Sequence, residues 1–364
     1  MTGHRFSKFI PTNEGQSAFD RLFKIFLELL NYTSGDVPEA LSWLTELDKE
    51  YKLTDKDYTL DDFINDLKKK GYLKDDLQTG KMLMTAKTEQ SMRKNAFDQL
   101  FGRIKKSAQG NHRTVFTGTG DELSGDRRAY MFGDSTDQID MTESIRNAQI
   151  HHGTEDFRLY EEDLEIVERE HKAQTSTVLM IDISHSMILY GEDRITPAKK
   201  VAMALAELIQ TRYPKDTLDI LVFGDDAQPI EVRDIPFLQV GPYHTNTVAG
   251  LELAMNLLRR RKNPNKQIFM ITDGKPSCMK QGEHLYKNSF GLDRMIVNRC
   301  LNLARTCRKM KIGINTFMLA EDNYLRSFIR EFSEANGGKA FYTGLNLLGE
   351  FILEDFEKNR KKKI

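Results

Sequence analysis

The sequence has few cysteines, almost no net charge and no long apolar run, and each shortage excludes a class of protein. Its three cysteines are an odd number without metal-ligand spacing, as expected in a reducing cytosol. Lysine and arginine number 53 against 54 acidic residues, so we expect no overall attraction to nucleic acid or to a membrane. No stretch reaches the about 18 apolar residues of a membrane span, and the N-terminus lacks the apolar run of a secretory signal. We therefore expect a cytoplasmic protein.

What remains is an ordinary globular composition. The chain of 364 residues is 39% hydrophobic and 29% charged, which is enough to bury a real core in two domains or three. Cys300 and Cys307 lie seven apart in an apolar helical pattern. We interpret both as small buried hydrophobic residues.

Residues 1–106 show helical periodicity and form the first predicted domain. Apolar side chains recur on one face of 18–30, and Thr59 can cap a helix that Gly71 ends. We expect helices over 18–30, 38–51, 60–70 and 86–106, with a short turn-and-strand pair at 75–85. This order loosely resembles a winged-helix unit, and a plain helical domain is an equally open interpretation. Asp61, Asp62 and Asp66 on the third helix argue against nucleic-acid binding.

Residues 107–156 are rich in glycine, serine, threonine and aspartate and poor in apolar periodicity. We interpret them as a linker or an ordered meandering arm between domains. The stretch FTGTGDELSG within them is not a phosphate loop, because it neither follows a strand nor carries the Lys-Ser/Thr pair of such a loop.

Residues 157–364 alternate between strands and helices and form the second predicted domain. Residues 157–170 can be a hairpin or an edge strand, and TVLMIDI reads as a strand buried on both faces. Further strands are expected at 218–224, 227–233, 267–274, 311–319 and 339–343, and helices from Thr196 and over 246–260, 291–309, 322–335 and 345–360. This alternation predicts an α/β fold with a doubly wound, mostly parallel sheet. Ligands of such folds bind at the carboxyl ends of strands, where Asp182 and Asp273 lie.

Two catalytic interpretations of Asp182-Ile-Ser-His-Ser186 fail. A serine hydrolase on such a sheet needs the glycines of G-x-S-x-G, and in an extended segment His185 would point away from both serines. A phosphatase of the haloacid-dehalogenase type needs an acid two residues after the first aspartate, where this chain has Ser184.

A site for a hard cation fits the same residues better. In extended or loop geometry, the period of two would place Asp182, Ser184 and Ser186 on one side. Thr245, directly before a helix, and Asp273, at the end of a strand, would add oxygens from other parts of the sheet edge. Mg²⁺ prefers such a shell of oxygens.

These five positions together resemble the metal-ion-dependent adhesion site of von Willebrand factor A (vWA) domains, over roughly residues 170–360. The resemblance implies that the hydroxyls of Ser184, Ser186 and Thr245 contact Mg²⁺ or Mn²⁺, while Asp182 and Asp273 act directly or through water. It also implies that a partner protein supplies a Glu or Asp to the ion. The protein is then a binding protein and not an enzyme.

A helical region, a glycine-rich arm including residues 126–148 and a C-terminal vWA domain resemble bacterial partners of AAA+ ATPases of the MoxR or magnesium-chelatase type. The resemblance implies an adaptor or co-chaperone that links such an ATPase to a client. The sequence has no ATP-binding motif, so the partner would provide the energy. Two alternatives stay open: a metal-dependent binding module without an ATPase, and a metal-assisted hydrolase.

Overall fold

The computed structural model describes residues 17–76, 80–101, 123–131, 136, 139–153, 158–169, 174–191, 193–273, 275–282, 284–288, 291–319 and 323–342. The chain divides into two compact units. The large unit combines Met1–Gln109 with Thr175–Lys358, and the small unit combines Gly110–Gln174 with Asn359–Ile364.

The N-terminal part of the large unit is helical, as predicted. It contains α1 (Ala18–Tyr32), α2 (Val37–Tyr51), α3 (Leu60–Lys69), the antiparallel strands β1 (Leu73–Asp75) and β2 (Met82–Met84), and α4 (Ala86–Phe101). Thr59 caps α3 as expected: its hydroxyl accepts from the N–H of Asp62, and the Asp62 carboxylate accepts from the N–H of Thr59. The predicted extension of the last helix to residue 106 lies outside the described residues.

The rest of the large unit is built on one six-stranded sheet with the order β12-β11-β8-β5-β6-β7. The strands are β5 (Thr175–Asp182), β6 (Thr217–Phe223), β7 (Ala227–Ile230), β8 (Asn265–Thr272), β11 (Ile312–Met318) and β12 (Lys339–Tyr342). All neighbours pair in parallel except β6 and β7, which pair antiparallel at the edge. The predicted α/β class and mostly parallel sheet are confirmed.

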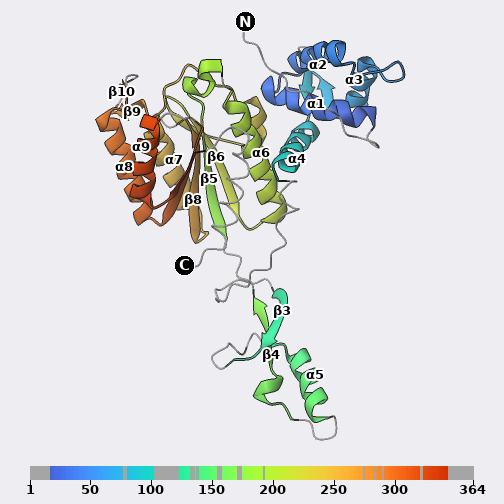
Figure 1. The fold of residues 1–364 in the computed structure, drawn as a ribbon, viewed down its shortest axis with the longest axis vertical. Helices are drawn as coiled ribbons and strands as arrows, with labels where there is room; N and C mark the ends of the chain where they lie inside the picture. The colour runs from blue at the N-terminus through green and yellow to red at the C-terminus, as the bar shows by residue number, and fades with distance from the viewer. Residues whose placement is uncertain are drawn as a thin grey trace. The chain divides into compact units, whose positions relative to one another are not determined.

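Helices cover both faces of this sheet, which explains why every residue of β5 is buried (Figure 1). Leu179 and Ile181 face α6 (Ile195–Arg212), whereas Val178 and Met180 face the opposite side. On that side lie α7 (Thr247–Arg260), α8 (Arg294–Lys309) and α9 (Asn323–Asn336). Cys300 and Cys307 are fully buried in α8, which confirms that they are packing residues.

The N-terminal helices and α6 share one hydrophobic core. A buried lysine on α6, Lys199, joins them: its ammonium donates to the carbonyl of Asn31 at 2.7 Å and the hydroxyl of Ser34 at 3.2 Å. It also lies 3.5 Å from the carbonyl oxygen of Pro236 and 3.3 Å from that of Leu238. The helical region is therefore part of the same compact body as the sheet.

The small unit contains a strand and a helix where the sequence predicted a linker or arm. β3 (Leu123–Ala129) pairs antiparallel with β4 (Glu165–Arg169), and α5 (Met141–His152) precedes a short 3₁₀ turn, η3 (Glu161–Asp163). The stretch read as a hairpin or edge strand thus pairs with β3. Apolar periodicity is weak here, and among the residues of the unit whose side chains the structure describes, Ala148 and Ile166 are the fully buried apolar ones.

Three further details differ from the sequence-based expectations or lie outside them. Helix α6 begins at Ile195, and Asp193 rather than Thr196 supplies the side chain that accepts an N–H of its first turn. The hairpin of β9 (Cys278–Gln281) and β10 (His284–Lys287) was not predicted. The helix expected at 345–360 lies outside the described residues. Within the described part, each helix is too short or too polar to cross a membrane.

Candidate cation site at the carboxyl edge of the sheet

The topology of the sheet places the two predicted carboxylates side by side. β5 is the first strand of the sheet in the chain, and it lies between β6 and β8. The chain therefore reverses its winding direction beside β5, which is the place where open α/β sheets bind ligands. Asp182 is the last residue of β5, and Asp273 directly follows β8.

The chain after β5 turns sharply, so residues 182–186 adopt the loop geometry, one of the two forms that the sequence left open. The N–H of Ser184 donates to Asp182 Oδ1 at 2.9 Å, and the 3₁₀ helix η4 (His185–Gly191) begins at the next residue. The turn still brings the hydroxyl oxygens of Ser184 and Ser186 within 3.0 Å of each other. The side chain of His185 is exposed.

The remaining predicted residues join this cluster. Thr245 Oγ1 donates to Ser184 Oγ at 3.0 Å, although 61 positions separate the two residues. The Ser186 hydroxyl lies close enough to the Asp273 carboxylate to lower the pKa of that group. Asp182, Ser184, Ser186, Thr245 and Asp273 therefore lie in one group of carboxylate and hydroxyl oxygens.

Two polar residues that the sequence reasoning missed hold this group in place. Thr272 Oγ1 donates to Asp182 Oδ2 at 2.7 Å, which fixes the carboxylate. Ser277 Oγ accepts from the N–H of Thr245 at 2.9 Å, and its own N–H donates to the Thr245 carbonyl at 3.0 Å. The sequence did contain a signal for Thr272, because it is a polar residue at the end of an otherwise apolar strand. It contained no such signal for Ser277, which is a serine in a loop.

The electrostatics of the group favour a cation. The Asp182 side chain is fully buried and Asp273 is 4% exposed. Burial raises the pKa of both carboxyl groups, and the negative charge of Asp273 raises that of Asp182 further. Arg194 lies 4.0 Å from Asp273 Oδ2 and offsets part of this charge. Two buried carboxylates among neutral hydroxyls are a donor set that fits a hard divalent ion.

The β9–β10 hairpin supports the loop that carries Thr245. Asp225, interpreted from the sequence as a rim or turn residue, accepts from the His244 N–H at 2.7 Å and pairs with Lys287 of β10 at 3.2 Å. Asp226 pairs with Lys280 of β9. These ion pairs occupy both aspartates, so neither belongs to the oxygen cluster.

Two family models match the chain. Residues 175–357 match the vWA domain of Rv0959-like proteins, and residues 122–169 match the third domain of the same proteins. Together the matches cover the sheet-bearing part of the large unit and the small unit.

Comparison with curated proteins gives relatives in mycobacteria. The uncharacterized protein Rv0959 of Mycobacterium tuberculosis and the uncharacterized protein Mb0984 of Mycobacterium bovis are each 28% identical over 275 residues. The matched region is 72% of this chain and 39% of each relative. The chain therefore spans about two fifths of the length of the relatives it matches.

Several solved structures are similar at low sequence identity. The vWF domain of the type V pili tip protein Mfa5 from Porphyromonas gingivalis is 11% identical, with 53% of this chain and 98% of that one covered and a TM-score of 0.42. The PilB minor pilin from Streptococcus sanguinis is 14% identical, with coverages of 54% and 64% and a TM-score of 0.41. The SpRpn10 VWA domain is 16% identical, with coverages of 50% and 95% and a TM-score of 0.38. These scores are below 0.5, so the family is assigned from the family model.

Proposed function

This chain belongs to the Rv0959-like family of vWA-domain proteins, and on that premise we propose that it is a protein-interaction protein whose binding depends on a divalent cation. The ion is Mg²⁺ or Mn²⁺, and Asp182, Ser184, Ser186, Thr245 and Asp273 hold it. One observation carries the proposal: these five side chains, from three separate stretches of chain, meet at one edge of the sheet with both carboxylates buried.

The donor set explains why such a site would serve recognition. The two carboxylates supply negative charge, whereas the three hydroxyls are neutral, so a bound divalent ion would keep part of its positive charge. The ion would then attract a Glu or Asp side chain of a partner protein. In this proposal the chain's own residues bind and orient, and catalysis is not part of their role.

We further propose that the partner is an AAA+ ATPase of the MoxR type and that the chain links this motor to a client protein. The support is the resemblance of the whole arrangement, including residues 126–148, to bacterial vWA partners of such ATPases. Because the sequence has no ATP-binding motif, the motor would supply the energy.

Calorimetric titration of the purified chain with Mg²⁺ tests the cation site. We expect Asp182→Ala to weaken Mg²⁺ binding by more than the about 10–100-fold that loss of an outer-shell partner costs. The matched control is Asp226→Ala, which removes an exposed aspartate paired with Lys280 and should bind Mg²⁺ as the wild type does. Equal Mg²⁺ affinity in Asp182→Ala and wild type would refute the site.

Affinity capture from cells of the source organism tests the partner. We expect a MoxR-type ATPase to be recovered with the wild type in Mg²⁺, and to be lost with EDTA or with Asp182→Ala. Recovery of the ATPase that is unaffected by EDTA would contradict the metal-bridged mechanism while retaining the partner. Recovery of no ATPase, with intact Mg²⁺ binding, would contradict the adaptor role alone.

A further inference from the structure

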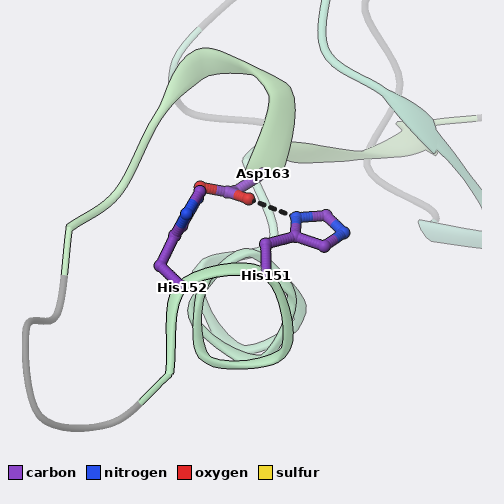
Figure 2. Close-up of side chains that lie close together, drawn as sticks. All are labelled: His151, His152 and Asp163. Atoms are coloured by element: carbon purple, nitrogen blue, oxygen red, sulfur yellow. Dashed lines mark hydrogen bonds and ion pairs between the residues drawn. The ribbon is translucent and has the colours of Figure 1, made fainter.

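The small unit contains a cluster of two imidazoles and one carboxylate (Figure 2). His151 and His152 end α5, and Asp163 ends the turn η3. His151 Nδ1 lies 2.6 Å from Asp163 Oδ1, and His152 Nε2 lies 3.1 Å from Asp163 Oδ2. Both rings therefore point toward the same carboxylate, as Figure 2 shows.

The carboxylate of this cluster is buried. The Asp163 side chain is 0% exposed, and it also accepts the N–H of Tyr160 at 2.9 Å. A buried carboxylate needs hydrogen-bond donors or a cation around it.

The three ligand atoms have the composition of a transition-metal site and lie close together. One nitrogen from each imidazole and a carboxylate oxygen lie within 4.8 Å of one another. Zn²⁺ binds this combination of donors, whereas Mg²⁺ prefers oxygen alone. Each imidazole can bind the ion through the nitrogen that faces Asp163 while its proton stays on the far ring nitrogen. The His151 side chain is 52% exposed, so solvent reaches the cluster.

The small unit has little hydrophobic core, so a bound metal ion would stabilise it. Its described residues bury few apolar side chains, and Gly110–Gln174 contains no cysteine that could form a disulfide. Small domains with little core usually need a disulfide, a metal or a partner to be stable. An ion held by His151, His152 and Asp163 would fasten the C-terminal end of α5 to the turn before β4.

We propose that the small unit binds one Zn²⁺-like divalent transition metal through His151 Nδ1, His152 Nε2 and the Asp163 carboxylate. The ion is structural: it links α5 to η3, and water fills the position that three protein ligands leave. This site is separate from the oxygen cluster of the vWA domain, so it does not depend on the function proposed above.

Titration of the untagged full chain with Zn²⁺, in excess Mg²⁺, tests the proposal. We expect saturable binding of one Zn²⁺ per chain at this site. When Co²⁺ replaces Zn²⁺, we expect a visible absorption band that is typical of nitrogen and oxygen ligands. His151→Gln should weaken binding by more than the about 10–100-fold that an outer-shell loss costs. The matched control is His284→Gln, an exposed histidine on β10, which should bind as the wild type does.

Hydrogen exchange of α5 supplies a second readout. Zn²⁺ should slow the exchange of the α5 amides in the wild type and leave them unchanged in His151→Gln. Absence of Zn²⁺ and Co²⁺ binding, or equal binding by wild type and His151→Gln, would overturn the proposal and leave the cluster as a hydrogen-bonded clasp. His151 is half exposed, so its substitution should not unfold the unit. Asp182→Ala should retain Zn²⁺ binding whatever becomes of the vWA site.

Discussion

The large and small units are stabilised in different ways. In the large unit, helices bury both faces of the sheet, and the N-terminal helices extend the core across α6. Among the residues of the small unit whose side chains are described, Ala148 and Ile166 are the fully buried apolar ones, and hydrogen bonds around Asp163 tie helix to turn. In the large unit the hydrophobic core positions the polar site. In the small unit the polar cluster around Asp163 itself contributes to the stability of the fold.

The two candidate cation sites reflect this difference. The vWA site takes its oxygens from strand ends and loops whose positions the sheet dictates, so we expect the scaffold to survive without an ion. The imidazole and carboxylate cluster belongs to a unit with little core, so we expect its ion to contribute to stability. The donor atoms also separate the sites chemically, because oxygen donors favour Mg²⁺ and imidazole nitrogens favour Zn²⁺.

Loss of a core ring should have the largest effect and should be confined to the large unit. Phe269 is fully buried on β8 and packs edge-on against Phe317 at 5.6 Å between ring centroids. We expect Phe269→Ala to lower the free energy of unfolding of the large unit by about 3–5 kcal/mol, measured by urea unfolding. Hydrogen exchange of α5 should not change. Equal loss of protection in α5 would mean that the two units unfold together, which would contradict their separate stabilisation.

The buried lysine between the N-terminal helices and the vWA part should have an intermediate effect. Lys199→Met leaves the carbonyls of Asn31 and Leu238 without this donor, and we expect it to cost about 1–3 kcal/mol at pH 7 in urea unfolding. The matched control is Lys215→Met, at an exposed position of the same unit, with an expected change within about 0.5 kcal/mol.

The pH dependence of the same pair of proteins gives a sharper test. Burial lowers the pKa of Lys199 from 10.5 to about 8. Below pH 8 the amine is charged in both the folded and the unfolded state, so the penalty for burying the charge is fully present. Between pH 8 and 10.5 only the unfolded state keeps the proton, so the wild type should gain stability relative to Lys199→Met. A difference that stays constant over this range would contradict the burial of a charged lysine.

A helix cap at the edge of the large unit should have the smallest effect. Thr59→Ala removes the hydroxyl that accepts from the Asp62 N–H, which should cost about 1 kcal/mol. Thr59→Ser keeps the hydroxyl and serves as the control. Because α3 shares the core that reaches α6, the loss should appear in the single urea transition of the large unit. A separate early transition for α3 would show that the N-terminal helices are an independent domain.

Periodicity predicted most of the large unit because its elements are long and fully buried on at least one face. The order of strands and helices from Thr175 to Tyr342 was expected, as were the cap at Thr59 and the packing role of Cys300. The β9–β10 hairpin was missed because its alternation of apolar residues is short. The strand and helix of the small unit were missed because residues 107–156 show little apolar periodicity.

The candidate cation site divides in the same way. Its five residues could be proposed from sequence because each ends or directly follows a strand, lies in the turn after one or precedes a helix, where chemistry is expected in this fold. The 3₁₀ turn at His185 and the contacts of Thr272 and Ser277 could not, since they depend on distances between separate strands and loops. Nothing in sequence spacing indicated that two adjacent histidines would meet an aspartate 11 and 12 positions later.

Local periodicity and backbone preference were enough to predict the α/β alternation, the cap at Thr59 and the residue types at the strand ends. The core that the N-terminal helices share with the vWA sheet, and the burial of Lys199 between them, are apparent only in the folded structure. The same holds for the meeting of His151, His152 and Asp163. Such contacts join segments that are separated in the chain, and the pattern of neither segment alone contains them.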